Sequence, residues 1–340
     1  MNEMSNKWIG KNTIRPDGAD KVTGRAEYAA DTTMPGMIWG KILRSPHPHA
    51  IIKSINTNKA ESLDGVHAVA TSKDFVDFPV DTPVILGIQD IRWMARNVLA
   101  KEKVLFHGHP IAAVAAKTEE IAQKACELIE VDYEVHDWAI EINDAIKDDA
   151  PILHDFIKFD GKPSNIAGTL EHKKGDIDKG FEEADVIIEK DFETAAVHQG
   201  YLENHACLVS VAPDDKTVIW SSSQGQFMVR AMTSFITGIP QSNIRAIPAE
   251  IGGGFGGKTI VYLEPVAAIL SKKSGRPVKM MMTREEVMRA SGPTSASKST
   301  VKIGATKDGK IIAAKGVFYL QAGAFPGSPI RGAAGCCLAP

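Results

Sequence analysis

The residues best suited to chemistry lie in one glycine-rich segment, Ala249-Glu250-Ile251-Gly252-Gly253-Gly254-Phe255-Gly256-Gly257-Lys258-Thr259. Gly252, Gly254 and Gly257 satisfy the dinucleotide fingerprint GxGxxG. With Lys258 and Thr259 the same segment also satisfies the phosphate-binding pattern GxxxxGK[ST]. Both patterns work because backbone N–H groups, free of bulky side chains, meet a phosphate at the N-terminus of a helix. The segment therefore predicts a loop that a ligand approaches closely.

Two features of the sequence argue against a nucleotide at this loop. Both kinds of nucleotide domain need further strand–helix–strand crossovers, whereas the residues after Thr259 are typical of a β-hairpin. A P-loop enzyme also needs an apolar strand that ends in an aspartate for Mg²⁺, and the apolar strand 278–282 runs into Thr283 instead. A third interpretation is a turn that only closes a tight corner. Because clustered glycines cost backbone entropy, we favour a ligand over this turn, and all three alternatives stay open.

Composition excludes several classes of function. The chain has a net charge of −3, which argues against a polybasic protein that binds nucleic acid or a membrane surface. The longest purely apolar stretch, 111–116, is too short to span a bilayer, and residues 1–11 contain no apolar signal segment. The cysteines are Cys126, Cys207, Cys336 and Cys337. They have no CxxC spacing, so we expect no metal site and no disulfide framework within this chain, and we expect a cytoplasmic protein.

The elements that must position the glycine segment are those of a mixed α/β chain. In the first part, strands are predicted at 38–44, 51–55, 66–70, 104–106, 111–116 and 131–133. Helices are predicted at 59–63 and after Thr118, where two glutamates follow the capping residue. The all-apolar strand 111–116 is expected to be buried on both faces. Residues 1–137 are therefore expected to form one α/β domain.

A connector, 138–165, and a second domain, 166–340, are expected to follow. The second domain has predicted strands at 186–188, 208–211, 217–220, 244–247 and 278–282, and predicted helices at 227–237 and 261–273. Residues 300–303 and 311–320 predict a hairpin. The sequence stops in a small, apolar run that ends at Pro340, soon after this hairpin. Because chain ends are usually polar, we expect either a chain cut within its domain or one half of a split protein.

Ordered runs of residues along the whole chain carry a resemblance. In the first domain they are 20–28, 43–50, 103–104, 108–112 and 129–134, with Asp31, Pro35 and Gly36. In the second they are 175–176, 184–185, His198, 202–206 and 223–224, with the glycine segment. The chain thereby resembles the molybdopterin-binding large subunit of the xanthine dehydrogenase/aldehyde oxidase family of molybdenum hydroxylases. The resemblance implies an N-terminal α/β hammerhead domain followed by the first part of a mixed α+β molybdopterin-binding domain.

The resemblance also implies site residues. Gly253, Gly254, Phe255 and Gly256 would lie at the molybdenum end of a molybdenum–pyranopterin cofactor, free or as its cytosine dinucleotide. Gln224 would donate a hydrogen bond to an oxygen on the metal, and Arg331 would help to form the substrate pocket. The family's catalytic glutamate would lie beyond Pro340, so no residue of this chain is assigned that role. Glu203 is expected to be a structural acid that binds backbone near the cofactor.

The activity implied is oxidative hydroxylation of an aldehyde or an N-heterocyclic or aromatic substrate, with water as the oxygen source. Electrons would pass to a 2Fe-2S iron–sulfur subunit and an FAD subunit, and the remainder of the molybdopterin domain would come from the same or another chain. The isolated chain is expected to be incomplete and inactive. The alternatives are a P-loop or dinucleotide-binding protein that uses the 252–259 loop, and a non-catalytic scaffold that only docks partner subunits.

Overall fold

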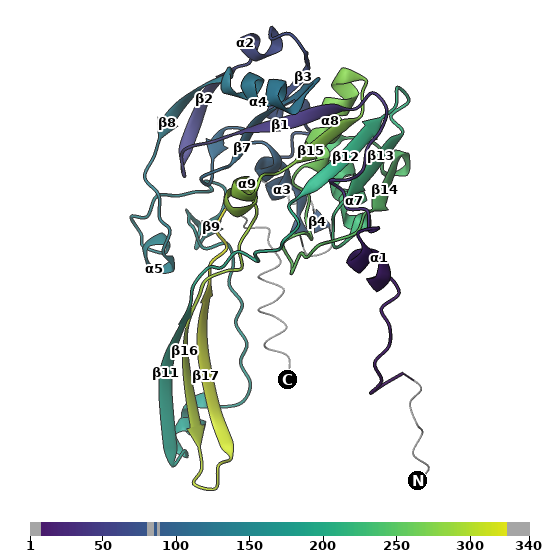
Figure 1. Cartoon of the computed structure of the whole chain (residues 1–340). Helices are drawn as coiled ribbons and strands as arrows, with labels where there is room; N and C mark the ends of the chain where they lie inside the picture. The colour runs from purple at the N-terminus through teal and green to yellow at the C-terminus, as the bar shows by residue number, and fades with distance from the viewer. Residues whose placement is uncertain (1–7, 80–84, 87–88, 325–340) are drawn as a thin grey trace.

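A seven-stranded mixed sheet forms the centre of the molecule (Figure 1). The computed structural model of the chain describes residues 8–79, 85–86 and 89–324. In spatial order the strands are β14 (Ile244–Pro248), β13 (Thr217–Ser221), β12 (Ala206–Val211), β15 (Val278–Met281), β1 (Ile38–Arg44), β7 (Pro110–Ala116) and β3 (Val66–Thr71). All seven residues of β7 are buried, as the sequence predicts. The mixed α/β class is therefore confirmed.

The central sheet joins the two halves of the chain. Strand β1 pairs in parallel with β15, with Ile38 opposite Val278 and Gly40 opposite Met280. A Cβ on Gly40 would lie 2.7 Å from Cγ of Met280. Only glycine fits this contact without a shift of the Met280 side chain. Three strands from residues 38–116 and four strands from residues 206–281 thus share one sheet.

Helices cover both faces of the central sheet. One face packs on α3 (Ile91–Val98), α7 (Gln226–Thr237) and α8 (Glu264–Ser274), and this is the main hydrophobic core. The other face, at the end that holds β3 and β7, packs on α2 (Asn58–Glu61) and α4 (Glu119–Glu127). Alternate residues of β7 pack into the two cores. Ala113 and Ala115 belong to the main core, whereas Ala112 and Val114 belong to the second core, which is formed with α2 and α4. This alternation follows from the two-residue period of a strand.

A small sheet beside the second core completes the N-terminal part. It consists of β6 (Lys103–Val104), β2 (Ala50–Asn56) and β8 (Glu130–Val135), all antiparallel neighbours. Shorter elements are α1 (Gly18–Thr23), the 3₁₀ turns Ser72–Asp74 and Gln241–Asn243, β4 (Ile85–Leu86) and β5 (Gln89–Asp90). The connector contains α5 (Ile142–Ala145) and a hairpin of β9 (Lys158–Phe159) and β10 (Lys162–Pro163).

A three-stranded antiparallel sheet projects from the body, at the lower left of Figure 1. We call it the projecting sheet; its strands are β11 (Val186–Thr194), β16 (Ser297–Ala305) and β17 (Ile311–Leu320). The strand alternation and the register place different sets of side chains on its two faces. One face carries Phe192, Ser299 and Phe318 in a row, whereas the opposite face carries Glu193, Lys298 and Tyr319. Helix α6 (Ile177–Glu182) packs on the charged face, where Gly180 lies against Ala313.

Most predicted elements are confirmed, and the differences are local. The helix predicted at 261–273 begins at Glu264, because residues 258–263 still belong to the loop. Helices α3, α6 and α9 (Arg284–Ala290) were not predicted. Thr283 and Glu286 form a capping box at the start of α9, so the sequence did contain a signal for this helix. No helix among the described residues is both long and apolar enough to cross a membrane.

Candidate functional site

The glycine loop, defined here as residues 251–258, lies at one edge of the central sheet. Strands β13 and β14 are parallel neighbours, and their carboxyl ends therefore meet at the same edge. Gln224 follows β13, whereas the glycine loop follows β14. Ligands of α/β sheets commonly bind outside the carboxyl ends of parallel strands. This topology brings together the two sets of residues that the sequence singles out, Gln224 and Gly253–Gly256.

Gln224 is bonded to the glycine loop through its side-chain oxygen. Its Oε1 atom accepts hydrogen bonds from the backbone N–H groups of Gly256 (2.9 Å) and Lys258 (3.2 Å). Its own backbone N–H donates to the carbonyl of Lys258 at 2.9 Å. Because two N–H groups converge on one atom, that atom must be the oxygen of the amide. The amide NH₂ group is then the part of Gln224 that is left to donate, and among the described residues it has no acceptor.

The loop also presents three consecutive backbone donors. Within the described part of the chain, the N–H groups of Gly253, Gly254 and Phe255 have no protein acceptor. Gly253, Phe255 and Gly256 have positive φ angles of 102°, 48° and 92°. A run of such residues makes a concave set of N–H groups that suits an anion or another oxygen-rich group. The Phe255 side chain is exposed beside these donors.

Protein side chains explain most of the glycines. A Cβ on Gly252 would lie 2.6 Å from Cβ of Glu203, and one on Gly254 would lie 2.5 Å from Oε1 of Gln224. At Gly253 and Gly257 the obstacle is Tyr201, whose ring lies under the loop. Only Gly256 has open space around it. Clustered glycines therefore do not by themselves indicate a ligand, because packing within the protein excludes a Cβ at Gly252, Gly254 and Gly257. Positive φ angles favour glycine at the other two positions.

Lys258 does not occupy the position of a P-loop lysine. Its side chain is fully buried, and its Nζ atom lies 2.6 Å from Oε2 of Glu203. The helix that follows begins at Glu264, so no helix N-terminus faces the loop directly after Thr259. A phosphate at the loop would meet neither the lysine charge nor the helix end that this motif requires. The P-loop interpretation of the 252–259 segment is therefore wrong.

Glu203 binds the backbone of the loop, as expected from the sequence. Its Oε2 atom accepts from the N–H of Gly252 at 2.8 Å. Its Oε1 atom is buried and has no partner among the described residues. The sequence contained no signal that Lys258 would turn inward to meet this carboxylate. The pair Glu203 and Lys258 is thus a feature that only the fold reveals.

A buried polar network supports the underside of the loop. The hydroxyl of Tyr201 lies 2.6 Å from Nε2 of His205 and 3.1 Å from Oγ of Ser291, and Ser291 also meets Nε2 of His198 at 2.8 Å. Burial lowers the pKa of His205 to about 3, with the nearby Lys258 cation as a smaller cause. Burial likewise raises the pKa of Tyr201. Both side chains are therefore neutral at physiological pH and act as hydrogen-bonding supports.

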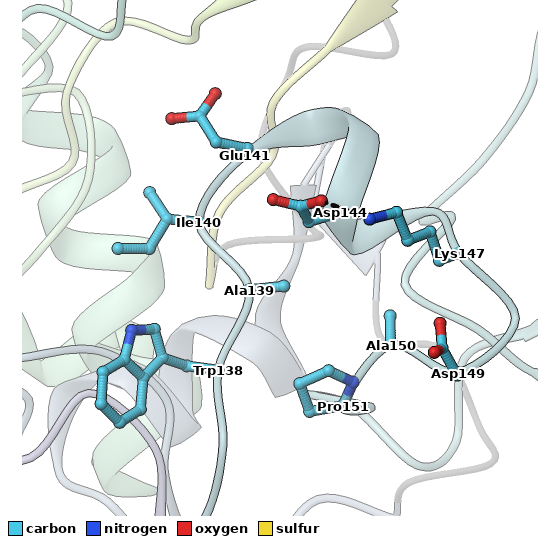
Figure 2. Close-up of a pocket in the computed structure, with 9 residues that line it drawn as sticks. All are labelled: Trp138, Ala139, Ile140, Glu141, Asp144, Lys147, Asp149, Ala150 and Pro151. Carbon is cyan, nitrogen blue, oxygen red and sulfur yellow. Dashed lines mark hydrogen bonds and ion pairs between the residues drawn. The ribbon is translucent and has the colours of Figure 1, made fainter.

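Other parts of the predicted site lie elsewhere. Arg331, which was predicted to line the substrate pocket, falls outside the described residues. The cysteines Cys336 and Cys337, to which no site was assigned, do so as well. The pocket in Figure 2, of about 400 Å³, lies in the connector between Trp138 and Pro151 and contains the ion pair of Asp144 and Lys147. None of its lining residues belongs to the glycine loop. This pocket is therefore separate from the candidate site.

Comparison with known proteins identifies two domain families in the chain. Residues 158–337 match the family model of the molybdopterin cofactor-binding domain. Residues 23–137 match the model of the aldehyde oxidase and xanthine dehydrogenase a/b hammerhead domain. The glycine loop and Gln224 lie within the first of these matches, and β1, β3 and β7 lie within the second.

Individual relatives cover nearly the whole chain. A probable xanthine dehydrogenase subunit of Bacillus subtilis is 37% identical over 300 residues, which are 88% of this chain and 38% of the relative. The nicotinate dehydrogenase large molybdopterin subunit of Eubacterium barkeri is 30% identical over 93% of this chain and 71% of its own length. The aldehyde oxidoreductase structure from Desulfovibrio gigas is 27% identical, with a TM-score of 0.80 over 92% of this chain and 34% of that chain. The chain thus spans about two fifths of the first of these relatives.

Proposed function

Because this chain belongs to the xanthine dehydrogenase and aldehyde oxidase family of molybdenum hydroxylases, we propose that it forms the molybdenum-cofactor-binding part of such an enzyme. The substrate class we propose is an aldehyde or an N-heterocyclic or aromatic compound. The observation that carries the proposal is the set of backbone N–H groups at Gly253, Gly254 and Phe255, which have no acceptor among the described residues and lie next to the amide NH₂ of Gln224. These donors lie within the segment that matches the molybdopterin family model.

The residues present fit a molybdenum–pyranopterin group. Such a group is rich in oxygen and nitrogen acceptors, and a dinucleotide form adds phosphates. The three backbone N–H groups and the amide NH₂ of Gln224 supply donors for these acceptors. When bound, the group supplies the redox chemistry of hydroxylation, with water as the source of the oxygen. We propose that Gln224 and Gly253 to Gly256 hold it.

The protein contributes orientation and electrostatics at this site. The N–H groups of Gly253, Gly254 and Phe255 are held by a loop whose two ends are tied to Glu203 and Gln224. They need no rearrangement to donate, which is the basis of electrostatic preorganisation. The exposed Phe255 ring supplies an apolar surface along which a flat ring system can lie.

Further parts of the enzyme are proposed to come from outside the described residues. We propose that the catalytic glutamate and the rest of the molybdopterin domain lie in the same or another chain, and that Arg331 contributes to the substrate pocket. Partner iron–sulfur (2Fe-2S) and FAD subunits would take the electrons away. We also propose a cytoplasmic location, since Cys126 and Cys207 are buried free thiols; recovery of the enzyme in a periplasmic or extracellular fraction would contradict it.

The test is the metal and nucleotide content of the assembled enzyme. Inductively coupled plasma mass spectrometry is expected to find molybdenum in near-stoichiometric amount, together with the fluorescence of oxidised pterin. Calorimetry with Mg–ATP is expected to show no binding, because Lys258 is buried and paired. Tight Mg–ATP binding that is lost in Lys258→Ala, in a protein without molybdenum, would overturn the proposed function.

A further inference from the structure

The two ends of the glycine loop converge on one carboxylate oxygen. Oε2 of Glu203 accepts from the backbone N–H of Gly252 at 2.8 Å and from Nζ of Lys258 at 2.6 Å. Gly252 is the first residue of the run of glycines, and Lys258 directly follows its last residue, Gly257. The backbone N–H of Glu203 also donates to the carbonyl of Gly252, at 3.3 Å. A single side chain from another segment therefore sets the distance between the two ends of the loop.

Because both side chains are largely buried, each charge of this ion pair is unfavourable without the other. The Lys258 side chain is 0% exposed and that of Glu203 is 11% exposed. The ammonium group also lies 5.0 Å from the centroid of the Tyr201 ring and 3.5 Å from Oγ of Ser222. Burial lowers the pKa of Lys258, and the bond to Glu203 acts in the opposite direction. Removal of one partner would leave an uncompensated charge in the interior, which is more costly than removal of both.

The pair is not optimised for stability alone. Oε1 of Glu203 is buried without a partner among the described residues, and an unsatisfied buried acceptor is unfavourable. Apolar residues of similar volume commonly stabilise a fold as well as a buried ion pair does. Apolar residues, however, would leave the N–H of Gly252 without its acceptor and would release the end of the loop at Lys258. The geometry of the loop is what the charged pair provides and an apolar pair would lack.

We propose that Glu203 and Lys258 are positioning residues, which hold the glycine loop so that the N–H groups of Gly253, Gly254 and Phe255 point together at the bound group. The role in cofactor binding rests on the proposed function, whereas the role in loop conformation does not. Gln224 and the ion pair then hold different parts of the loop. Gln224 binds the later part of the loop through Gly256 and Lys258, and Glu203 ties its two ends together.

The test compares single and double variants in the assembled enzyme. Glu203→Met and Lys258→Met each leave one buried charge, and both are expected to lower the melting temperature. The double variant, with Met at both positions, is expected to regain most of the lost melting temperature because no charge is stranded. Amide hydrogen exchange of a peptide that covers 251–258 is nevertheless expected to stay about tenfold faster than in the wild type, and molybdenum content to stay below about half.

Lys41→Met is the matched control. Lys41 is a nearly buried lysine that pairs with Glu119 at 2.6 Å on the far side of the central sheet. Its loss is expected to lower the melting temperature without faster exchange in the glycine loop. A double variant with wild-type exchange at 251–258 and wild-type molybdenum content would overturn the proposal. A wild-type enzyme without molybdenum would instead refute the proposed function, and the exchange data would still decide the role of the pair in the loop.

Discussion

At the scale of single residues, the orientation of the Gln224 amide matters most. Two backbone N–H groups occupy its oxygen, so the NH₂ group faces away from the loop. A glutamine at this position therefore makes two separate contributions. Its oxygen holds the loop, and its NH₂ group can donate a hydrogen bond. A substitution can remove one contribution and keep the other.

Gln224→Glu tests the donor. The carboxylate keeps an oxygen for the N–H groups of Gly256 and Lys258, but it has no hydrogen to donate and adds a negative charge. We expect turnover of the assembled enzyme to fall by about 10²-fold or more, while hydrogen exchange of the loop stays close to that of the wild type. Unchanged steady-state kinetics in Gln224→Glu would show that the amide NH₂ has no role in the reaction.

Gly254→Ala tests the space beside Gln224. The new Cβ would lie 2.5 Å from Oε1 of Gln224 and would displace that side chain from the loop. We expect a loss of about 1–3 kcal/mol of stability and a lower molybdenum content. Gly225→Ala is the control, since its Cβ would make only an ordinary 3.7 Å contact with Met228 and its φ of −159° suits any residue. Equal effects of the two substitutions on molybdenum content would contradict this explanation.

At the scale of elements, the projecting sheet has an unusual distribution of side chains. Its charged face holds cross-strand pairs, such as Lys298 with Glu193 at 3.4 Å, and is partly covered by α6. Its other face carries exposed apolar side chains, with Ile188 56%, Phe192 58% and Phe318 60% exposed, and it also carries Lys190 and Ser299. Exposed apolar side chains that gather on one face mark contact surfaces or promote association.

We expect the purified chain to bind the dye 1-anilinonaphthalene-8-sulfonate through this face. Phe318→Ser is expected to reduce the dye fluorescence by about half and to reduce self-association in sedimentation measurements. Tyr319→Ser is the control, because Tyr319 is a neighbouring aromatic residue on the charged face. If the two variants lose dye binding to the same extent, the apolar face is not the binding surface.

At the scale of the whole molecule, the central sheet connects the parts that the sequence separates. The division into 1–137, 138–165 and 166–340 remains a proposal about the chain. Lys147 is an exposed trypsin site in the connector, and we expect limited proteolysis to cut first there. Because β1 pairs with β15, the two fragments are expected to elute together in size-exclusion chromatography and to separate only in denaturant. Early cuts within 104–133, or fragments that elute apart, would contradict this prediction.

Buried histidines predict how stability depends on pH. Burial lowers the pKa of His109 to about 3, of His154 to about 4 and of His205 to about 3. Below about pH 6.5 the unfolded chain binds protons at these positions and the folded chain does not. Stability is therefore expected to fall from pH 6.5 towards pH 4, by up to about 1.4 kcal/mol per pH unit for each histidine.

His109→Gln tests this dependence through urea unfolding at pH 7, 6 and 5. The variant is expected to be less stable at pH 7, because Nδ1 of His109 accepts from the N–H of Leu105 and Nε2 lies 3.0 Å from the carbonyl of Arg96. Its stability should nevertheless fall less steeply as the pH decreases. His67→Gln, at an exposed position on β3, should leave the slope unchanged. A slope in His109→Gln equal to that of the wild type would refute the explanation.

The sequence by itself determined most of the elements and pointed to the family, although it did not predict helices α3, α6 and α9. Strand 111–116 could be recognised because its apolar run is local, and the helix after Thr118 because its cap and acidic first turn are adjacent in the chain. Ordered motifs, including the glycine segment, pointed to the molybdopterin family that the comparisons identify. These signals extend over a few residues, which is the range at which hydrophobic periodicity and capping act.

Only the tertiary structure decided how the site is built. Gly252 and Gly254 are required by Glu203 and Gln224, which lie about 50 and 30 positions earlier in the sequence. The inward turn of Lys258 likewise depends on a carboxylate from another segment. Local patterns do not specify such pairings. The free energy of burying a charge depends on the residue that packs against it, and so does the need for glycine at a given position. The same long-range packing paired β1 with β15 and so joined in one sheet the two parts that the sequence divides.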